Sequence, residues 1–289
     1  TPSSAFPFYG FNFGGSYDGD NFDLVTAYPL FQTCNGQFTR LNITASIYAS
    51  AAKLAAVCGE MVGGSATISD SRLAVGSIIQ NLGTNSETTG GFAGTMSGGT
   101  IAHCNSMANV MGSSAPTITG YTGGLVGDFA GGSISDSYFG GNLSGGTGNF
   151  NYIGGIAGHM TDMYGTPQII RSYTSGSYNA KGVLGGMVGW QEGGVISQSF
   201  ANIALNNTMS YTGGFVGKIG GTGTIEDSFV IGSVVSSSYA GGFAGMTYGG
   251  TLSRNYSAVG TISGTTLGSF VAYNTAATFN NNYFNDLGL

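Results

Sequence analysis

The chain has 289 residues, of which 54 are glycine, 41% are hydrophobic and only 7% carry a charge. So much glycine beside only 5 prolines excludes a collagen-like or proline-rich chain, and the apolar content argues against disorder. Seven basic and thirteen acidic residues leave a net charge of −6, which provides no basic surface for nucleic acid or an anionic membrane.

The first segment is an aromatic arm, AFPFYGFNFGG, which contains Phe6, Phe8, Tyr9, Phe11 and Phe13. Its phenylalanines alternate as strand residues do, while two nearby prolines disfavour a central strand. We expect the arm to fold back and cap the first structural unit of its own chain. The alternative is that it adds a strand to the next subunit and makes a head-to-tail filament.

The sequence DGDNFD follows the arm and places Asp18, Asp20 and Asp23 within six residues. Such a cluster is similar to calcium-binding loops, but it lacks the EF-hand layout with Gly at the sixth position and Glu at the twelfth. We therefore expect a turn with solvated carboxylates and keep calcium as the alternative.

Three cysteines are too few for a disulfide framework. Cys34 and Cys58 are separated by about the length of one repeat unit, so we consider a bridge between adjacent units near the N-terminal end. Cys104 occupies a position that is Ser in most units, which predicts a buried free thiol.

A motif of the form Gly-Gly-x-x-Gly, with two apolar residues inside it, recurs at intervals of roughly 30 residues. The copies are GGFAG (90–94), GGLVG (123–127), GGIAG (154–158), GGMVG (185–189), GGFVG (213–217) and GGFAG (241–245). Each is followed by an apolar residue, then three positions later Ser or Asn, and then usually an aromatic residue, as in Ile134, Ser137 and Tyr138. A weaker apolar site comes next, as at Leu143 and Val234.

Three short β-like segments per unit, separated by glycine-rich corners, predict one coil of a β-solenoid. We therefore expect an all-β chain that forms a single elongated β-solenoid, or β-helix, of about eight or nine coils with three short strands per coil and capped ends. The predicted organisation is an aromatic arm and capping coil (1–55), repeat coils (56–266) and a degenerate C-terminal coil or cap (267–289).

The units GGLVGDFAGGSISDSYFGGNLSG and GGFVGKIGGTGTIEDSFVIGSVVS resemble the GLUG repeat, which is named for its Gly, Leu, hydrophobic, Gly core. The resemblance covers roughly residues 90–264 and leaves both ends of the chain unassigned. It implies a large extracellular or cell-surface protein of the adhesin-like kind, in which the repeat itself is not a catalytic unit.

The residue just before the Ser or Asn position predicts a charge ladder along the solenoid. In successive coils it is Asp70, His103, Asp136, Arg171, Gln198, Asp227 and Arg254. Opposite charges become neighbours at Asp136 with Arg171 and at Asp227 with Arg254, which avoids stacking like charges. A metal or acid–base site at His103 is the alternative, but no third strong ligand is evident.

Side-chain amides and glycosylation sequons complete the polar positions. Asn255 and Asn282 are expected to form an amide ladder in the inward Ser/Asn column. Sequons occur at Asn42, Asn142, Asn206 and Asn255, and Asn142 and Asn206 are the best placed for glycosylation because Asn255 faces inwards.

The two apolar positions of the glycine motif raise the question of an exposed apolar column. Strict strand alternation would turn one of them, for example Phe92 or Ala93, towards solvent. A bend at the glycines would bury both, and this is what we expect.

No catalytic constellation stands out, because the acids are scattered and only two histidines are present. Trp190 is the single tryptophan available as a sugar platform. An ice-binding solenoid would need a regular threonine array. Thr224 and Thr251 share a column, but we align Ser135 and Val195 with the same position in earlier coils, so the array is interrupted.

We therefore expect a non-catalytic extracellular or cell-surface protein, without a cofactor, that has a structural or adhesive role and self-assembles into filaments through its terminal segments. Expected partners are its own copies, with surface carbohydrate or protein ligands as further candidates. We expect no nucleic-acid partner and no transmembrane segment. The alternative function is a carbohydrate-binding or carbohydrate-processing β-solenoid, which clustered acids and a wall of aromatic residues in one groove would support.

Overall fold

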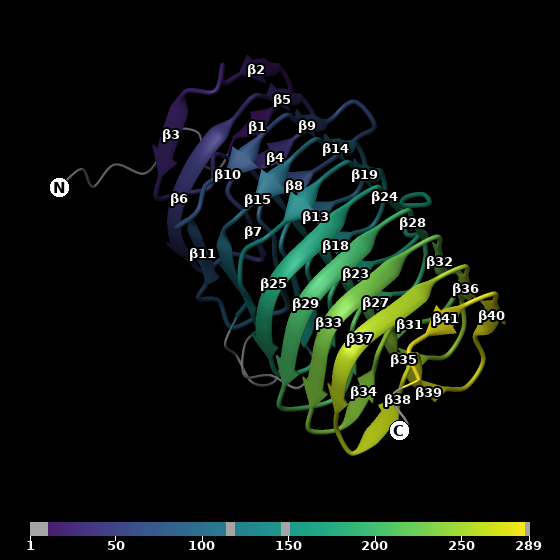
Figure 1. Ribbon diagram of the computed structural model, residues 1–289. Coiled ribbons are helices and arrows are strands. Elements are labelled where there is room, and N and C mark those ends of the chain that lie inside the picture. Colours follow the sequence, from purple (N-terminus) through teal and green to yellow (C-terminus); the bar gives the residue numbers. More distant parts are fainter. Residues whose placement is uncertain (1–10, 114–118, 146–150, 287–289) are drawn as a thin grey trace.

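The computed structural model describes residues 11–113, 119–145 and 151–286. Over these ranges the chain winds into an elongated β-solenoid of about 8 turns, as the repeat predicted, with the two termini at opposite ends (Figure 1). The solenoid is built from parallel strands stacked coil on coil. None of the described residues belongs to a helix long and apolar enough to cross a membrane.

Each regular coil contributes four strands, one more than expected from the sequence. A representative coil contains β26 (Val183–Gly185), β27 (Val188–Gln191), β28 (Val195–Ser197) and β29 (Phe200–Asn207). The extra strand was missed because the glycine motif begins at the end of one strand and continues into the next, so two strands read as a single segment. The weak third apolar site, in contrast, lies on the same strand as the aromatic residue in the later coils, as Val234 and Phe229 do in one strand (Phe229–Ser236).

The four strands of each coil belong to four parallel sheets, which we name A to D. Sheet A contains β1 (Asn12–Phe13), β4 (Phe31–Cys34), β8 (Cys58–Met61), β13 (Ala93–Met96), β18 (Val126–Phe129), β23 (Ala157–Met160), β27, β31 (Val216–Ile219), β35 (Ala244–Thr247) and β39 (Val271–Asn274). Sheet B contains β2 (Ser16–Asp18), β5 (Gln37–Thr39), β9 (Thr67–Ser69), β14 (Thr100–Ala102), β19 (Ser133–Ser135), β24 (Gln168–Ile170), β28, β32 (Thr224–Glu226), β36 (Thr251–Ser253) and β40 (Thr278–Asn280).

Sheet C holds the longest strands, and sheet D precedes sheet A in each coil. Sheet C contains β3 (Asp23–Thr26), β6 (Asn42–Ala49), β10 (Arg72–Leu73), β11 (Ile78–Asn81), β15 (Asn105–Ser106), β16 (Asn109–Met111), β20 (Tyr138–Phe139), β21 (Leu143–Ser144), β25 (Tyr173–Ala180), β29, β33 (Phe229–Ser236), β37 (Tyr256–Ser263) and β41 (Tyr283–Phe284). Sheet D contains β7 (Lys53–Leu54), β12 (Glu87–Thr89), β17 (Gly120–Gly123), β22 (Asn151–Gly154), β26, β30 (Tyr211–Gly213), β34 (Tyr239–Gly241) and β38 (Thr266–Gly268).

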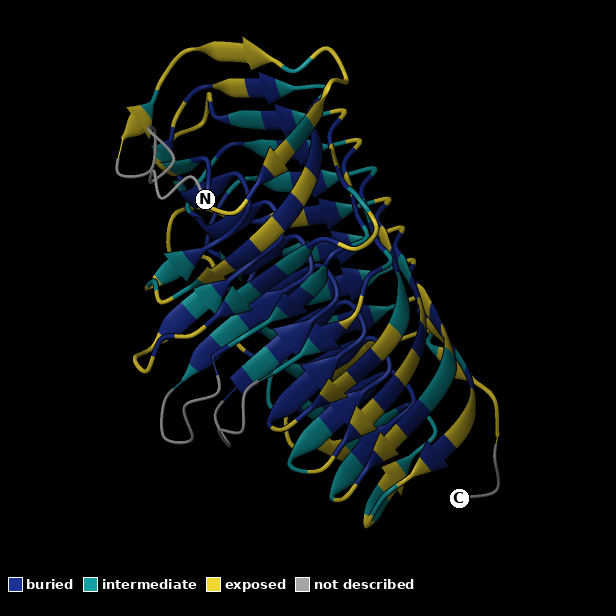
Figure 2. Ribbon diagram, turned by 90° about the vertical axis from the view of Figure 1, so that its left-hand side faces the viewer, coloured by how far each residue is buried: buried dark blue, intermediate teal, exposed yellow. Residues whose placement is uncertain are grey.

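The core is a set of apolar columns that run the length of the solenoid, visible as the buried interior in Figure 2. The central column of sheet B pairs Ile68 with Ile101 and Ile101 with Ile134, and all three are fully buried. Both apolar positions of the glycine motif are also buried, as Phe92 and Ala93 illustrate. The glycine bend therefore buries both columns, as expected, and leaves no exposed column there.

Inward polar side chains tie neighbouring coils together at the corner between sheets B and C. The Ser137 hydroxyl donates to the carbonyl of Ser135 at 2.7 Å and accepts the backbone N–H of Cys104 at 3.2 Å. Near the C-terminal end Asn255 takes this role, and its amide donates to the Asn282 side chain at 3.1 Å. This hydrogen bond confirms the predicted amide ladder. Asn255 is also fully buried, which makes it unsuitable for glycosylation.

Candidate functional site

The charge ladder is present at the corner that follows each strand of sheet B. Arg171 donates two hydrogen bonds to Asp136, both at 2.7 Å, and Arg254 pairs with Asp227 at 2.6 Å. His103 and Asp70 are 3.8 Å apart and largely exposed. No group of three metal-ligating side chains that could hold an ion occurs among the residues that the structure describes.

The ladder positions share a backbone conformation that the sequence did not reveal. All of them have positive φ, between 47° and 56°, including Arg171, Gln198 and Arg254. Only a few per cent of non-glycine residues adopt this region. The left-handed turn directs these side chains away from the core and brings the next residue, Ser or Asn, inwards. The arginines hold the pKa of Asp136 and of Asp227 below the usual range through their hydrogen bonds.

The DGDNFD turn is occupied by protein contacts. Arg40 donates to Asp18 and lies 3.0 Å from Asp20, and the Asn42 amide donates to Asp23. These carboxylates are therefore paired with neighbouring side chains. The sequence pattern had predicted a turn in which they are only solvated.

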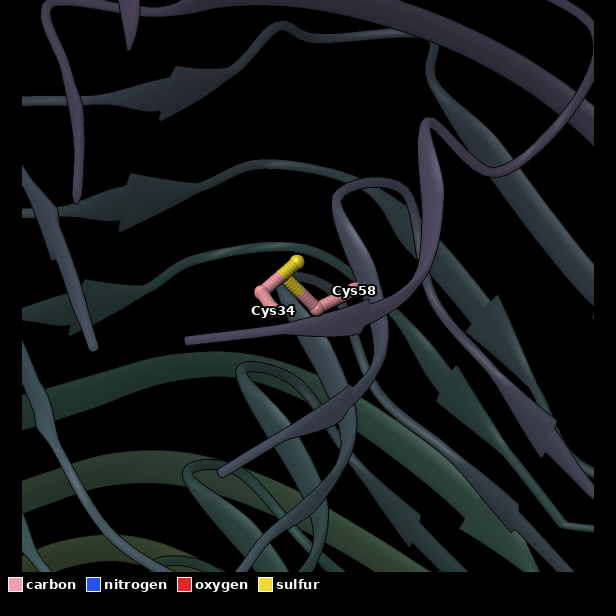
Figure 3. The surroundings of a disulfide bond; sticks show 2 residues. All are labelled: Cys34 and Cys58. Atoms are coloured by element: carbon pink, nitrogen blue, oxygen red, sulfur yellow. A yellow bond between two sulfur atoms is a disulfide. The ribbon is translucent and has the colours of Figure 1, made fainter. Parts of the chain in front are cut away.

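Cys34 and Cys58 form a disulfide that links β4 and β8 of adjacent coils, with a Cα–Cα distance of 5.9 Å (Figure 3). Cys104 is a buried free cysteine, and burial raises the pKa of its thiol to about 12. This thiol is therefore a packing residue rather than a nucleophile.

The aromatic arm is described only from Phe11 onwards, so Phe6, Phe8 and Tyr9 lie outside the described residues. Phe13 lies in β1, which pairs with β4 of the same chain, and its ring packs 4.8 Å from Phe31 and 4.7 Å from Phe38. Phe11 is exposed. The described end of the arm thus folds onto its own first coils.

Two further sequence positions need comment. Asn142 and Asn206 are both exposed, Asn142 in the turn before β21 and Asn206 in β29 of sheet C. In the column of Thr224 and Thr251, the residue contributed by β19 is Ser133 and not Ser135, whereas Val195 does belong to it. Our alignment of Ser135 was wrong by two positions, because Ser135 follows the buried Ile134 whereas Thr224 precedes Ile225 in the same column.

The most concentrated chemistry lies where sheets A and D meet on the side of the solenoid. The last glycine of each motif has no room for a side chain. A Cβ on Gly158 in β23 would lie 2.4 Å from the backbone nitrogen of Thr122 in β17, and one on Gly189 would lie 2.5 Å from that of Ile153. Because only hydrogen fits there, each strand of sheet A approaches the sheet D strand of the preceding coil, and their outward side chains meet.

These side chains form a continuous surface that we call the lateral strip. Its members are Tyr121, Asp128, Tyr152, His159, Trp190, Glu192, Lys218 and Tyr248. Four of them follow the last glycine of consecutive motifs, since Asp128 pairs in register with His159, His159 with Trp190, and Trp190 with Lys218.

His159 is at the centre of the strip. Its Nδ1 is 2.9 Å from Asp128 and its Nε2 is 3.2 Å from Glu192. Its ring stacks on Tyr121 at a centroid distance of 4.5 Å and lies 4.9 Å from Trp190. An ionised carboxylate only accepts hydrogen bonds, so both ring nitrogens of His159 face groups that accept and do not donate.

The other half of the strip is organised around Trp190. Its ring stacks on Tyr152 at 4.7 Å, and its indole N–H donates to the Tyr248 hydroxyl at 2.6 Å. The Lys218 ammonium lies 5.1 Å from the Trp190 ring and 5.2 Å from the Tyr248 ring, within the range of cation–π attraction.

Partial burial shifts the titration of the strip. Burial, reinforced by the charge of Asp128, raises the pKa of Tyr121 to about 12. Burial also raises the pKa values of Tyr152 and Tyr248. Burial lowers the pKa of Lys218, and the nearby charge of Glu192 opposes that change. Clustered shifts of this kind are typical of functional surfaces.

Sequence reasoning missed the strip. It singled out His103, which is exposed, and passed over His159, which is buried between carboxylates. The available signal was the residue immediately after each motif, which reads Asp, His, Trp and Lys in consecutive copies. Only the close approach of sheets A and D adds Tyr121 and Tyr152 to it, and Tyr248 joins from the turn after β35 through its hydrogen bond with Trp190.

A second aromatic row, which we call the aromatic ladder, lies on the outer face of sheet C. It consists of Tyr138, Tyr173, Phe200, Phe229, Tyr256 and Tyr283. Rings in neighbouring coils stack at 4.2 to 5.0 Å from Tyr138 to Phe229. The outward residues of β25, β29, β33 and β37 include no charged side chain.

Comparison of the chain with protein-family models, with curated proteins and with solved structures gives no match. The resemblance to GLUG repeats therefore rests on the motifs and on the β-solenoid fold.

Proposed function

We infer that the protein is a non-catalytic extracellular structural element with adhesive capacity, which assembles end to end. The main support is that one cross-section repeats from β1 to β41. Within the described residues, the terminal strands have a neighbour on one side only. Unpaired strand edges template further strands, and natural solenoids need caps for that reason.

The apolar columns also remain open at the ends of the described chain. Tyr17 stacks in register on Phe38 and is 47% exposed, and Phe279 stacks on Leu252 at the other end of the same column and is 40% exposed. Phe284, in the neighbouring column, is 51% exposed. Docking the first coil of one copy on the last coil of another would bury these rings. Such a head-to-tail contact does not close on itself, so it produces a filament.

Three features support an extracellular or cell-surface location. The Cys34–Cys58 disulfide is typical of an oxidising compartment. The exposed sequons at Asn142 and Asn206 are accessible to glycosylation in a secretory pathway. The GLUG-like motifs are similar to those of adhesin-like surface proteins.

The test is the assembly state of the intact chain and of a double variant, Phe279→Asp with Phe284→Asp. Light scattering and negative-stain imaging at matched concentrations should show rods that lengthen with concentration for the intact chain. Buried carboxylates would block docking, so the double variant should remain a single rod. Val75→Asp, at an exposed apolar residue in the turn after β10, is the matched control and should assemble normally.

An intact chain that stays monomeric at every concentration would overturn the proposal. A chain lacking residues 1–10 separates the two roles of the arm. Loss of assembly with unchanged stability assigns the arm to the contact between copies, and loss of stability assigns it to the cap.

A further inference from the structure

We propose that the lateral strip binds a neutral, extended polysaccharide that lies along the solenoid axis. This goes beyond end-to-end assembly, because the strip lies on the side of the rod and uses none of the terminal residues. It contains the only tryptophan of the chain and one of its two histidines.

The charges of the strip favour a neutral ligand. Asp128 and Glu192 face His159, and Glu192 also lies close enough to Lys218 to affect its pKa. Carboxylates and basic side chains therefore alternate along consecutive coils. Because the two signs are interspersed, the strip presents no field of one sign to attract a polyanion or a polycation.

The shape of the strip favours a chain rather than a compact molecule. It extends over the coils of β18, β23, β27, β31 and β35, and strands spaced by 4.7 to 4.9 Å give it a length of roughly 20 Å. Three hollows of the described chain, next to Lys53, Asp18 and Asn109, are lined by neither Trp190 nor His159. Small ligands usually occupy enclosed pockets, whereas an extended chain needs only a long, shallow surface.

The side-chain chemistry matches a hydroxylated chain. Tyr121, Tyr152 and Tyr248 combine apolar ring edges with hydroxyl groups that donate and accept hydrogen bonds. The half-exposed carboxylate of Glu192 accepts hydrogen bonds, and Lys218 donates them. Because the rings stack on one another, these groups are held in place before the ligand arrives, which lowers the entropic cost of binding.

Trp190 provides a built-in reporter, since all tryptophan fluorescence comes from the strip. We would titrate the intact chain with oligosaccharides of β-linked glucose and of N-acetylglucosamine of increasing length, and with oligogalacturonate as the anionic counterpart. Sedimentation with insoluble cellulose and chitin is the second readout. A saturable change in Trp190 emission with one of the neutral series, stronger for longer chains, is expected.

Tyr152→Ala and Lys218→Ala should each weaken binding about tenfold, which corresponds to 1.4 kcal/mol. Phe229→Ala, in the aromatic ladder, is the matched control and should bind as the intact chain does. Circular dichroism verifies that each variant is folded. Binding to neither neutral series, tighter binding of oligogalacturonate, or equal weakening by Phe229→Ala would overturn the proposal.

The assembly variant keeps this test independent of the proposed function. Phe279→Asp with Phe284→Asp should bind the same oligosaccharides with unchanged affinity, because it leaves the strip intact. If the intact chain binds glycans but never forms rods, end-to-end assembly fails and the glycan site stands.

Discussion

The lateral strip and the aromatic ladder are two rows of side chains on the same set of coils, and they differ in composition. The ladder repeats one kind of residue, as Tyr173, Phe200 and Phe229 show, whereas the strip changes in every coil. In an in-register parallel stack, identical aromatic rings pack favourably on one another, but identical charges repel. The residue type in the charged lateral strip therefore varies from coil to coil. For this reason a search for repeated residues detects the aromatic ladder and overlooks the lateral strip.

The two rows also differ in what lies behind them. The ladder lies on an open face of long strands, while the strip forms where Gly158 and its counterparts let two sheets approach. The close approach partly buries the polar groups of the strip, as the raised pKa of Tyr121 indicates. The position of the glycines thus distinguishes the aromatic ladder, whose rings only pack on one another, from the lateral strip, whose polar groups have shifted pKa values.

The largest effect should come from removing that glycine contact. Gly158→Ala would place a Cβ 2.4 Å from the Thr122 nitrogen, so β23 must move away from β17. We expect a loss of about 3 kcal/mol, at the upper end of the cost of overpacking. Denaturant unfolding followed by circular dichroism measures it. Gly64→Ala, where nothing lies within 4 Å, is the control. Equal stability of the two variants would show that the sheets are not held together as described.

A smaller loss is expected when the centre of the strip is removed. His159→Leu leaves Asp128 and Glu192 without the imidazole that joins them and should cost about 2 kcal/mol. Adding Asp128→Asn and Glu192→Gln should recover part of this loss, because neutral amides are easier to desolvate. Thermal unfolding of the single and triple variants gives the comparison. No recovery in the triple variant would argue against the charge explanation.

Alkaline pH should reveal the burial of Tyr121 in the strip. The folded chain holds the Tyr121 proton up to a pKa of about 12, whereas the unfolded chain releases it near 10. The raised pKa therefore adds stability that is fully present below pH 10 and is lost as the pH rises through about 12. Tyr121→Phe should flatten the fall of the melting temperature between pH 10 and 12. An unchanged slope would contradict this assignment.

The smallest loss of stability is expected for a substitution in the aromatic ladder. Phe229→Ala removes a half-exposed ring that stacks on Phe200 and should cost about 0.5 to 1 kcal/mol. Val75→Ala, at an exposed apolar side chain in a turn, should change almost nothing. Chemical unfolding of both variants measures the difference. A loss for Phe229→Ala larger than that for His159→Leu would reverse the contrast between the two rows.

The site was less predictable than the fold for a physical reason. The inward Ile and Ser columns recur because every coil must bury the same cross-section, so Ile134 and Ser137 could be recognised from periodicity. The pairing of Arg171 with Asp136 followed from the same register. His159 and Trp190 point outwards, where packing imposes no repetition of residue type, so only their place after the glycine motif marks them.

The sequence by itself determined the solenoid, the apolar columns and the charge ladder, since all of these depend on one periodic register. The Cys34–Cys58 bridge between adjacent coils was considered from spacing alone, and the structure established it. Only the tertiary structure decided that each coil has four strands, that the residues of the charge ladder adopt positive φ, and that Tyr121 lies against His159. Those features depend on how closely two strands approach across a corner. That distance is set by backbone contacts at glycine, and the glycine motif in the sequence does not show which two strands these contacts bring together.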